Sequence, residues 1–174
     1  MVIAKRIATL ALMCLLLGVI FGLPWLAIDA NKDVSNPLFS FKTDHAFVFF
    51  GFTSCHGVCP MTLNQLANLE DDLLANGVEV VYVDIEKHGD HQAADDYAKS
   101  FHRSFNGLAP TALELTQMKR DFGLNIVEGE SSIQHQGRLY LVENRGGKQI
   151  LSRVFNALKF TPESLSAELH KLGS

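Results

Sequence analysis

The chain has 174 residues, 47% of them hydrophobic, which is enough for one domain with a buried core. Its formal net charge is −4, and it contains no basic run. Nucleic-acid-binding proteins neutralise phosphates with basic patches, so the composition excludes that class of protein.

The N-terminal segment is apolar. Lys5 and Arg6 precede 22 uncharged residues, from Ile7 to Ile28, and a helix needs about 20 apolar residues to span a bilayer. We therefore predict a transmembrane anchor within residues 1–30, with a cleaved signal peptide as the alternative. Because the basic residues precede the apolar run, the N-terminus is expected on the inner side. This predicts a single-pass protein of the inner membrane with its soluble domain on the periplasmic side.

A polar connector is predicted at residues 31–44, and one domain at residues 45–174. Hydrophobic periodicity predicts strands at 45–52, 78–84, 138–143 and 148–154, and helices at 60–75, 91–105, 111–122 and 163–172. Residues 125–136 show no clear periodicity and are predicted as a loop. The first strand–helix–strand unit predicts parallel strands, and the last two strands predict an antiparallel hairpin. This order is the thioredoxin-like α/β architecture, a central mixed sheet flanked by helices.

Two cysteines follow the first predicted strand. The apolar run 47–52 leads into Cys55-His56-Gly57-Val58-Cys59-Pro60, and proline suits the start of a helix. The pair should therefore lie between a strand and a helix N-terminus, where thiolates are stabilised. Because Cys14 lies in the apolar segment, the domain keeps one close pair. A single pair indicates a metal site or a redox site, not a disulfide scaffold.

Two thiolates favour a third ligand. His135 is the best placed of the histidines, because it lies in the loop just before the strand at 138–143, where thioredoxin-like folds bring a loop against the first cysteine turn. His56 is a weaker candidate, and His88 with His91 is either a loose second metal site or a polar loop. Two cysteines and one histidine suit Cu(I) better than tetrahedral zinc. Oxidation of the pair to a disulfide would release the copper, so metal binding and redox state are linked.

These motifs resemble the Sco/SenC family of membrane-anchored copper proteins. The resemblance spans about residues 45–172 and is carried by Gly51–Pro60, by Val80–Asp84, and by His135 followed by Leu139–Val142. It implies that Cys55, Cys59 and His135 bind Cu(I) or Cu(II). It also implies that Asp84 supports the site or relays charge in redox steps. The chain departs from the family pattern at His56-Gly57, where Pro-Asp is usual, and at Ile85, where proline is usual.

The resemblance implies a metallochaperone that assists assembly of the binuclear copper site of cytochrome c oxidase. Its partner would be the copper-site subunit of the oxidase or another copper protein. The alternative is an extracytoplasmic thiol:disulfide oxidoreductase, in which Cys55 and Cys59 are a catalytic redox pair that reduces a partner's cysteines. The two functions differ over His135, since a reductase needs only a suitable cysteine potential.

Overall fold

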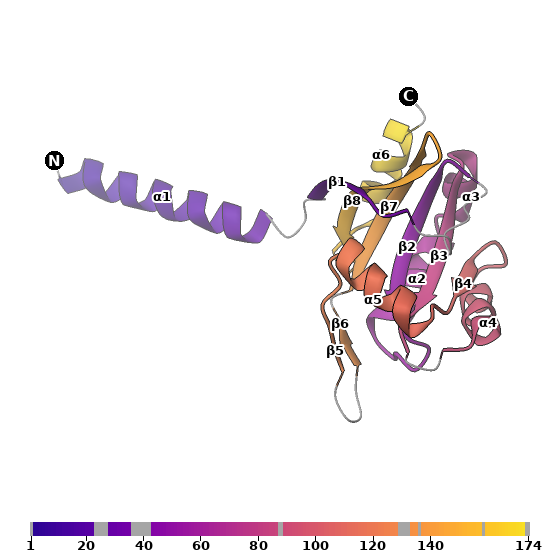
Figure 1. Ribbon diagram of the computed structural model, residues 1–174. Helices are drawn as coiled ribbons and strands as arrows, with labels where there is room; N and C mark the ends of the chain where they lie inside the picture. Colours follow the sequence, from indigo (N-terminus) through magenta and orange to yellow (C-terminus); the bar gives the residue numbers. More distant parts are fainter. Residues whose placement is uncertain are drawn as a thin grey trace.

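A six-stranded mixed sheet forms the centre of the computed structural model (Figure 1). The structure describes residues 2–22, 28–35, 43–86, 89–128, 133–135, 137–157 and 159–172. The strand order is β1 (Ile28–Asp33), β8 (Lys148–Asn156), β7 (Arg138–Arg145), β2 (His45–Gly51), β3 (Val78–Asp84) and β4 (Asn106–Leu108). The neighbours β2 and β3, and β3 and β4, are parallel, and the other pairs are antiparallel. The predicted parallel unit and the predicted hairpin are both confirmed.

Helices cover both faces of the sheet. One face packs against α2 (Val58–Ala67), α3 (Glu70–Ala75), α4 (His91–Phe101) and α6 (Pro162–Leu172), and the other against α5 (Ala112–Asp121). Successive strand residues point to opposite faces, so in β2 Phe47 and Phe49 join the first core while Val48 and Phe50 join the second. A strand buried on both faces must be apolar throughout, which explains the continuous run in the sequence. The predicted central sheet flanked by helices is confirmed.

The helix predicted at residues 60–75 is two helices. α2 ends at Ala67, and the chain turns at Asn68 and Leu69 before α3 begins. Leu69 lies in the core, whereas Met61 of α2 and Leu74 of α3 are exposed by 58% and 59%.

The helix predicted at residues 91–105 ends at Phe101, and the short strand β4 follows. Gly107 allows β4 to approach α4 closely, because a Cβ at this position would lie 2.1 Å from the carbonyl oxygen of Ala94. Only glycine permits this contact.

The segment predicted as a loop at residues 125–136 contains a hairpin. Strands β5 (Ile126–Glu128) and β6 (Ile133–His135) pair antiparallel, with Ile126 opposite His135. Three-residue strands are too short to show a period, although their β-branched residues favour extended backbone. His135 therefore ends a strand, and the prediction of a loop at this position is wrong.

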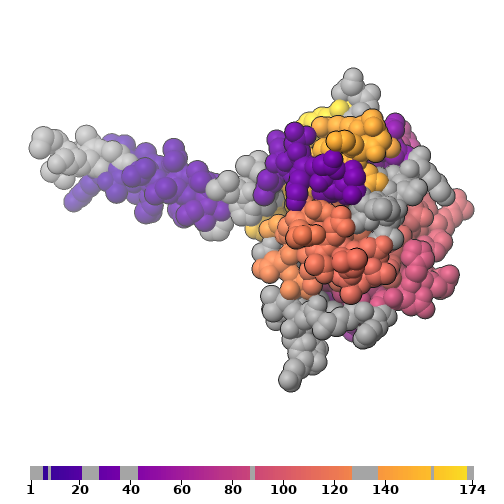
Figure 2. Space-filling model, viewed as in Figure 1, coloured from indigo at the N-terminus to yellow at the C-terminus, as the bar shows by residue number. Residues whose placement is uncertain are grey.

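The N-terminal helix α1 (Val2–Gly22) extends away from the sheet and exposes its apolar side chains (Figures 1 and 2). Among the helices in the described ranges, none is both long and apolar enough to cross a membrane. The predicted transmembrane helix is thus not borne out.

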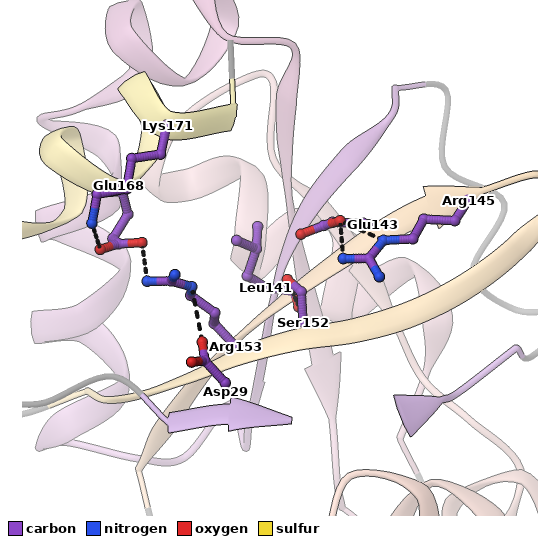
Figure 3. Close-up of polar contacts among 8 residues, drawn as sticks. All are labelled: Asp29, Leu141, Glu143, Arg145, Ser152, Arg153, Glu168 and Lys171. Atoms are coloured by element: carbon purple, nitrogen blue, oxygen red, sulfur yellow. Dashed lines mark hydrogen bonds and ion pairs between the residues drawn. The ribbon is translucent and has the colours of Figure 1, made fainter. Parts of the chain in front are cut away.

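The edge strand β1 was not anticipated. It starts at Ile28, inside the predicted anchor, and pairs with β8. Arg153 of β8 connects three elements, because its Nε lies 3.3 Å from Asp29 Oδ1 of β1 and its Nη1 bonds Glu168 of α6 (Figure 3). Glu168 also pairs with Lys171 Nζ at 2.7 Å. The Arg153–Asp29 pair therefore helps to hold the exposed edge strand β1 on β8, and the Arg153–Glu168 pair ties β8 to α6.

Candidate metal and thiol site

The site lies at the carboxyl ends of two parallel strands. Gly51 at the end of β2 pairs with Asp84 at the end of β3, and Ile85 N–H donates to the Gly51 carbonyl at 2.8 Å. The chain then turns, with Cys55 N–H donating to the Phe52 carbonyl at 3.0 Å, and enters α2. The predicted position of the cysteines, between a strand and a helix, is confirmed. The helix begins at Val58 rather than Pro60, so Cys59 lies in its first turn.

Cys55 is half-buried and stands over the start of α2. Burial raises the pKa of the Cys55 thiol, but a hydrogen bond from the Cys59 thiol and the backbone N–H groups of residues 57–59 outweigh burial and lower the pKa below 9.0. N–H groups at a helix start stabilise a thiolate. Cys55 is therefore the accessible, activated sulfur.

Cys59 is fully buried, with an exposed fraction of 0%. Burial, and then the hydrogen bond and charge of Cys55, raise the pKa of the Cys59 thiol to about 12. Both thiols are free, and the hydrogen bond between them shows that the sulfurs are close. A half-buried thiol of lowered pKa beside a buried thiol can share a soft metal or close to a disulfide.

Gly51 provides the space that the buried sulfur occupies. A Cβ on Gly51 would lie 3.1 Å from Cys59 Sγ and 2.9 Å from Cε2 of Tyr82. The Tyr82 ring therefore lies beside Cys59, with its own ring centroid 5.1 Å from that of Tyr97. Burial, and then the charges of Asp84 and Cys59, raise the pKa of Tyr82. Within the described residues its buried hydroxyl has no hydrogen-bond partner, so this phenol stays neutral.

Asp84, predicted to support the site, is 2% exposed and lies on the same side of β3 as Tyr82. Burial is the main cause that raises its pKa to about 6, and the charge of Glu86 adds to the shift. One oxygen, Oδ1, accepts the Glu86 N–H at 3.1 Å. Its carboxyl is thus a buried group beside the cysteine turn, able to hold or release a proton near neutral pH.

Three further residues, Thr53, Ser54 and Glu86, join the two loops of the site. Ser54 Oγ donates to Glu86 Oε1 at 2.8 Å, and Thr53 Oγ1 donates to Glu86 Oε2 at 3.4 Å. The sequence analysis assigned no role to Glu86 and so missed this one. The available signal was that the ends of neighbouring parallel strands meet at one edge of a sheet.

The side chain of the predicted third ligand, His135, lies outside the described part of the chain, as does His88. Its backbone ends β6. Where side chains are described, no group of three His, Cys, Asp or Glu residues gathers to hold a metal ion. His56 is exposed in the cysteine turn, and His91 is exposed at the start of α4. The structure thus brings the two thiols together, and the histidine ligand stays a prediction.

Comparison with known proteins gives one consistent family. The family model described as SCO1/SenC matches residues 22–173. An SCO2-like protein of Rickettsia prowazekii is 26% identical over 135 residues, covering 72% of this chain and 65% of its own length. The chain thus spans slightly under two thirds of this relative.

Solved structures share the fold. The structure of Bradyrhizobium japonicum ScoI with copper bound superposes with a TM-score of 0.61 at 24% identity, covering 83% of this chain and 99% of that one. A structure of BsSco, described as a member of the Sco family of cytochrome c oxidase assembly proteins with a disulfide switch, gives a TM-score of 0.61 at 18% identity, covering 84% of this chain and 96% of that one. At these identities the likeness concerns the fold.

Proposed function

Because the chain belongs to the SCO1/SenC family, we propose that it is a copper metallochaperone that assists assembly of the binuclear copper site of cytochrome c oxidase. The observation that carries this proposal is the pair of free thiols, one activated at a helix start and one buried beside it. Thiolates select Cu(I) among the metals available to such a site. Copper is the cargo here, and Cys55, Cys59 and His135 are its proposed ligands.

The asymmetry of the two thiols suits transfer. Cys55 is accessible to an incoming cysteine ligand, whereas Cys59 is covered by core side chains. A partner can therefore compete for copper first at Cys55, and the buried Cys59 releases last. Asp84, close to the turn and buried, is proposed to take up or release a proton as the thiols exchange metal.

We also propose that the domain works on the periplasmic side of the inner membrane. Exposed apolar side chains from Ile7 to Ile20 of α1 support a location at a membrane, since a contiguous apolar surface of this kind marks an interaction site. A thiol pair that cycles between copper-bound and disulfide states also fits an oxidising compartment.

The test is an anaerobic Cu(I) titration of the reduced full chain in mild detergent against a competing chelator. A Cys14→Ser background removes the exposed thiol of α1. We expect one tight equivalent, which is lost in Cys55→Ser/Cys59→Ser. Removing the third ligand with His135→Ala should weaken binding at least tenfold, or about 1.4 kcal/mol.

The matched control is His56→Ala, which removes an exposed imidazole from the cysteine turn itself. It should leave the affinity within about twofold, well under the tenfold that 1.4 kcal/mol represents. An unchanged affinity in His135→Ala would refute the three-ligand site.

A second candidate function is reduction of a partner's disulfide. It is favoured by one observation, the opposite pKa shifts of Cys55 and Cys59, which match an attacking thiolate and a resolving thiol. If the titration finds no tight Cu(I) site in the wild-type chain, this reductase becomes the leading function.

A further inference from the structure

We propose that Glu86 is a positioning residue that clamps the cysteine turn through Thr53 and Ser54, and so sets both the copper affinity and the reduction potential of Cys55 and Cys59. The inference rests on the proposed function of the cysteine pair. Among the described residues, Glu86 has no hydrogen bond to either cysteine sulfur. Its effect on the cysteines would therefore pass through the turn.

The clamp is built from one short hydrogen bond to the Glu86 carboxylate and one longer, weaker one. Each oxygen of the Glu86 carboxylate accepts one hydroxyl, Oε1 from Ser54 at 2.8 Å and Oε2 from Thr53 at 3.4 Å. The short bond from Ser54 has a carboxylate acceptor and is therefore stronger than a bond between neutral groups. The two donors are the residues directly before Cys55, and they lie 32 and 33 positions from Glu86 in the chain. The carboxylate thus joins two loops that the sequence keeps apart.

Glu86 is itself held firmly. Its backbone N–H donates to Asp84 Oδ1 at 3.1 Å, and its carbonyl accepts the N–H of Gly89 at 3.2 Å. The preceding N–H, that of Ile85, continues the ladder to β2 by bonding Gly51 at 2.8 Å. Because hydrogen bonds hold both the N–H and the carbonyl of Glu86, its side chain can fix the cysteine turn relative to the end of β3.

The position of the turn decides the hydrogen bonds of Cys55. The backbone N–H groups of residues 57–59 reach Cys55 Sγ only while the turn holds the sulfur over the start of α2. Both cysteines are free in this arrangement, and the clamp would hold Cys55 where these N–H groups stabilise its reduced form. Losing it should make the dithiol less favourable relative to the disulfide, and should weaken a metal site that needs both sulfurs in place.

The experiment compares Glu86→Ala, Glu86→Gln and Thr53→Val/Ser54→Ala in the full chain with Cys14→Ser. The first readout is the equilibrium of the metal-free disulfide with glutathione. We expect Glu86→Ala and Thr53→Val/Ser54→Ala each to shift this equilibrium about tenfold toward the disulfide, which is about 30 mV for a two-electron couple. Glu86→Gln, whose amide keeps one acceptor oxygen, should have an intermediate effect.

The second readout is Cu(I) affinity, which should fall at least fivefold in Glu86→Ala and in Thr53→Val/Ser54→Ala. Combining the two sets of changes should add little to either alone, because both remove the same contacts. The matched control is Glu79→Ala, which removes a half-buried carboxylate from the far end of β3. Glu79 accepts from Thr43 Oγ1 at 3.3 Å and Asn106 Nδ2 at 3.4 Å, so its loss should lower stability without moving the potential.

Two results would overturn the clamp. One is a potential and a Cu(I) affinity that stay within twofold of wild type in Glu86→Ala. The other is a shift in Glu86→Gln with none in Thr53→Val/Ser54→Ala, which would mean that the charge of Glu86 acts without the hydroxyls. The reduction potential is measured without metal. If the wild-type chain fails to bind Cu(I), that result contradicts the proposed function, and the glutathione equilibrium alone still tests the clamp.

Discussion

Asp84 links the stability of the domain to pH. Its pKa is raised from 3.8 to about 6, mainly by burial. Below pH 3.8 the carboxyl is protonated in both the folded and the unfolded chain, and its contribution to stability is fully present. As the pH rises through about 6, that contribution is lost, because the folded protein must ionise a buried group.

We therefore expect Asp84→Asn to stabilise the protein relative to wild type by up to about 3 kcal/mol at pH 7, and by almost nothing near pH 4. The amide oxygen of asparagine can still accept the Glu86 N–H. The measurement is urea unfolding of both proteins between pH 4 and pH 7.

The matched control for Asp84→Asn is Asp95→Asn, because the pKa of Asp95 is lowered whereas that of Asp84 is raised. Burial raises the pKa of Asp95, but hydrogen bonds from Lys99 and the Gly107 N–H outweigh it and lower the pKa below 3.8. Asp95→Asn should therefore be less stable than the wild-type protein above pH 4, where the ionised Asp95 stabilises the folded state. A difference between Asp84→Asn and wild type that stays constant over the whole pH range would refute the assignment.

At the scale of elements, the edge strand β1 depends on Arg153. The side chain is 31% exposed, and its partner Glu168 of α6 only 16%, so this ion pair is less screened than a fully exposed one. Arg153→Met keeps the packing of the stem and removes the pairs to Asp29 and Glu168 (Figure 3). We expect a loss of about 1 kcal/mol in the free energy of unfolding at low salt.

High salt should shrink this loss, since the Debye length falls to about 3 Å at 1 M ionic strength. The control is Lys99→Met, whose side chain is 48% exposed and pairs with Asp95 of its own helix α4, so it should cost less. Urea unfolding at low and high salt measures both variants. A loss in Arg153→Met that is independent of salt would mean that packing, and not charge, fastens β1.

At the scale of the whole molecule, α1 and the domain should be independent in stability. Apolar side chains all along α1, from Ile7 to Ile20, are exposed, and the helix extends away from the sheet (Figure 1). Removing residues 1–22 should therefore change the unfolding midpoint by less than about 2 °C, since about 1 kcal/mol corresponds to 2–4 °C in a chain of this size. It should also reduce self-association, because the apolar surface is gone.

The comparison variant removes residues 1–33 and so deletes β1 with its ion pairs. It should unfold several degrees lower than the shorter truncation. Calorimetry gives the midpoints, and sedimentation gives the association state. A fall of more than about 5 °C on removing residues 1–22 alone would show that α1 packs on the domain.

The central strands could be predicted from sequence because each contains a continuous apolar run, at residues 46–50 in β2 and 80–83 in β3, that is buried on both faces. β2 ends one residue before its predicted end, and β3 matches its predicted bounds. The edge strands β1 and β4 and the hairpin of β5 and β6 could not be predicted. Their extended form depends on pairing with distant segments, as β1 does with β8, and pairing leaves no local period in a strand of three to six residues.

The sequence by itself determined the spacing of Cys55 and Cys59, their place before a helix and the family they indicate. Only the tertiary structure decided that Cys55 is accessible and Cys59 buried, that Asp84 and Tyr82 line the same side of β3, and that Glu86 holds the cysteine turn. The physical reason is that burial and hydrogen bonding act through space. The turn at residues 53–55 and the turn at residue 86 meet because parallel strands end at one edge of the sheet.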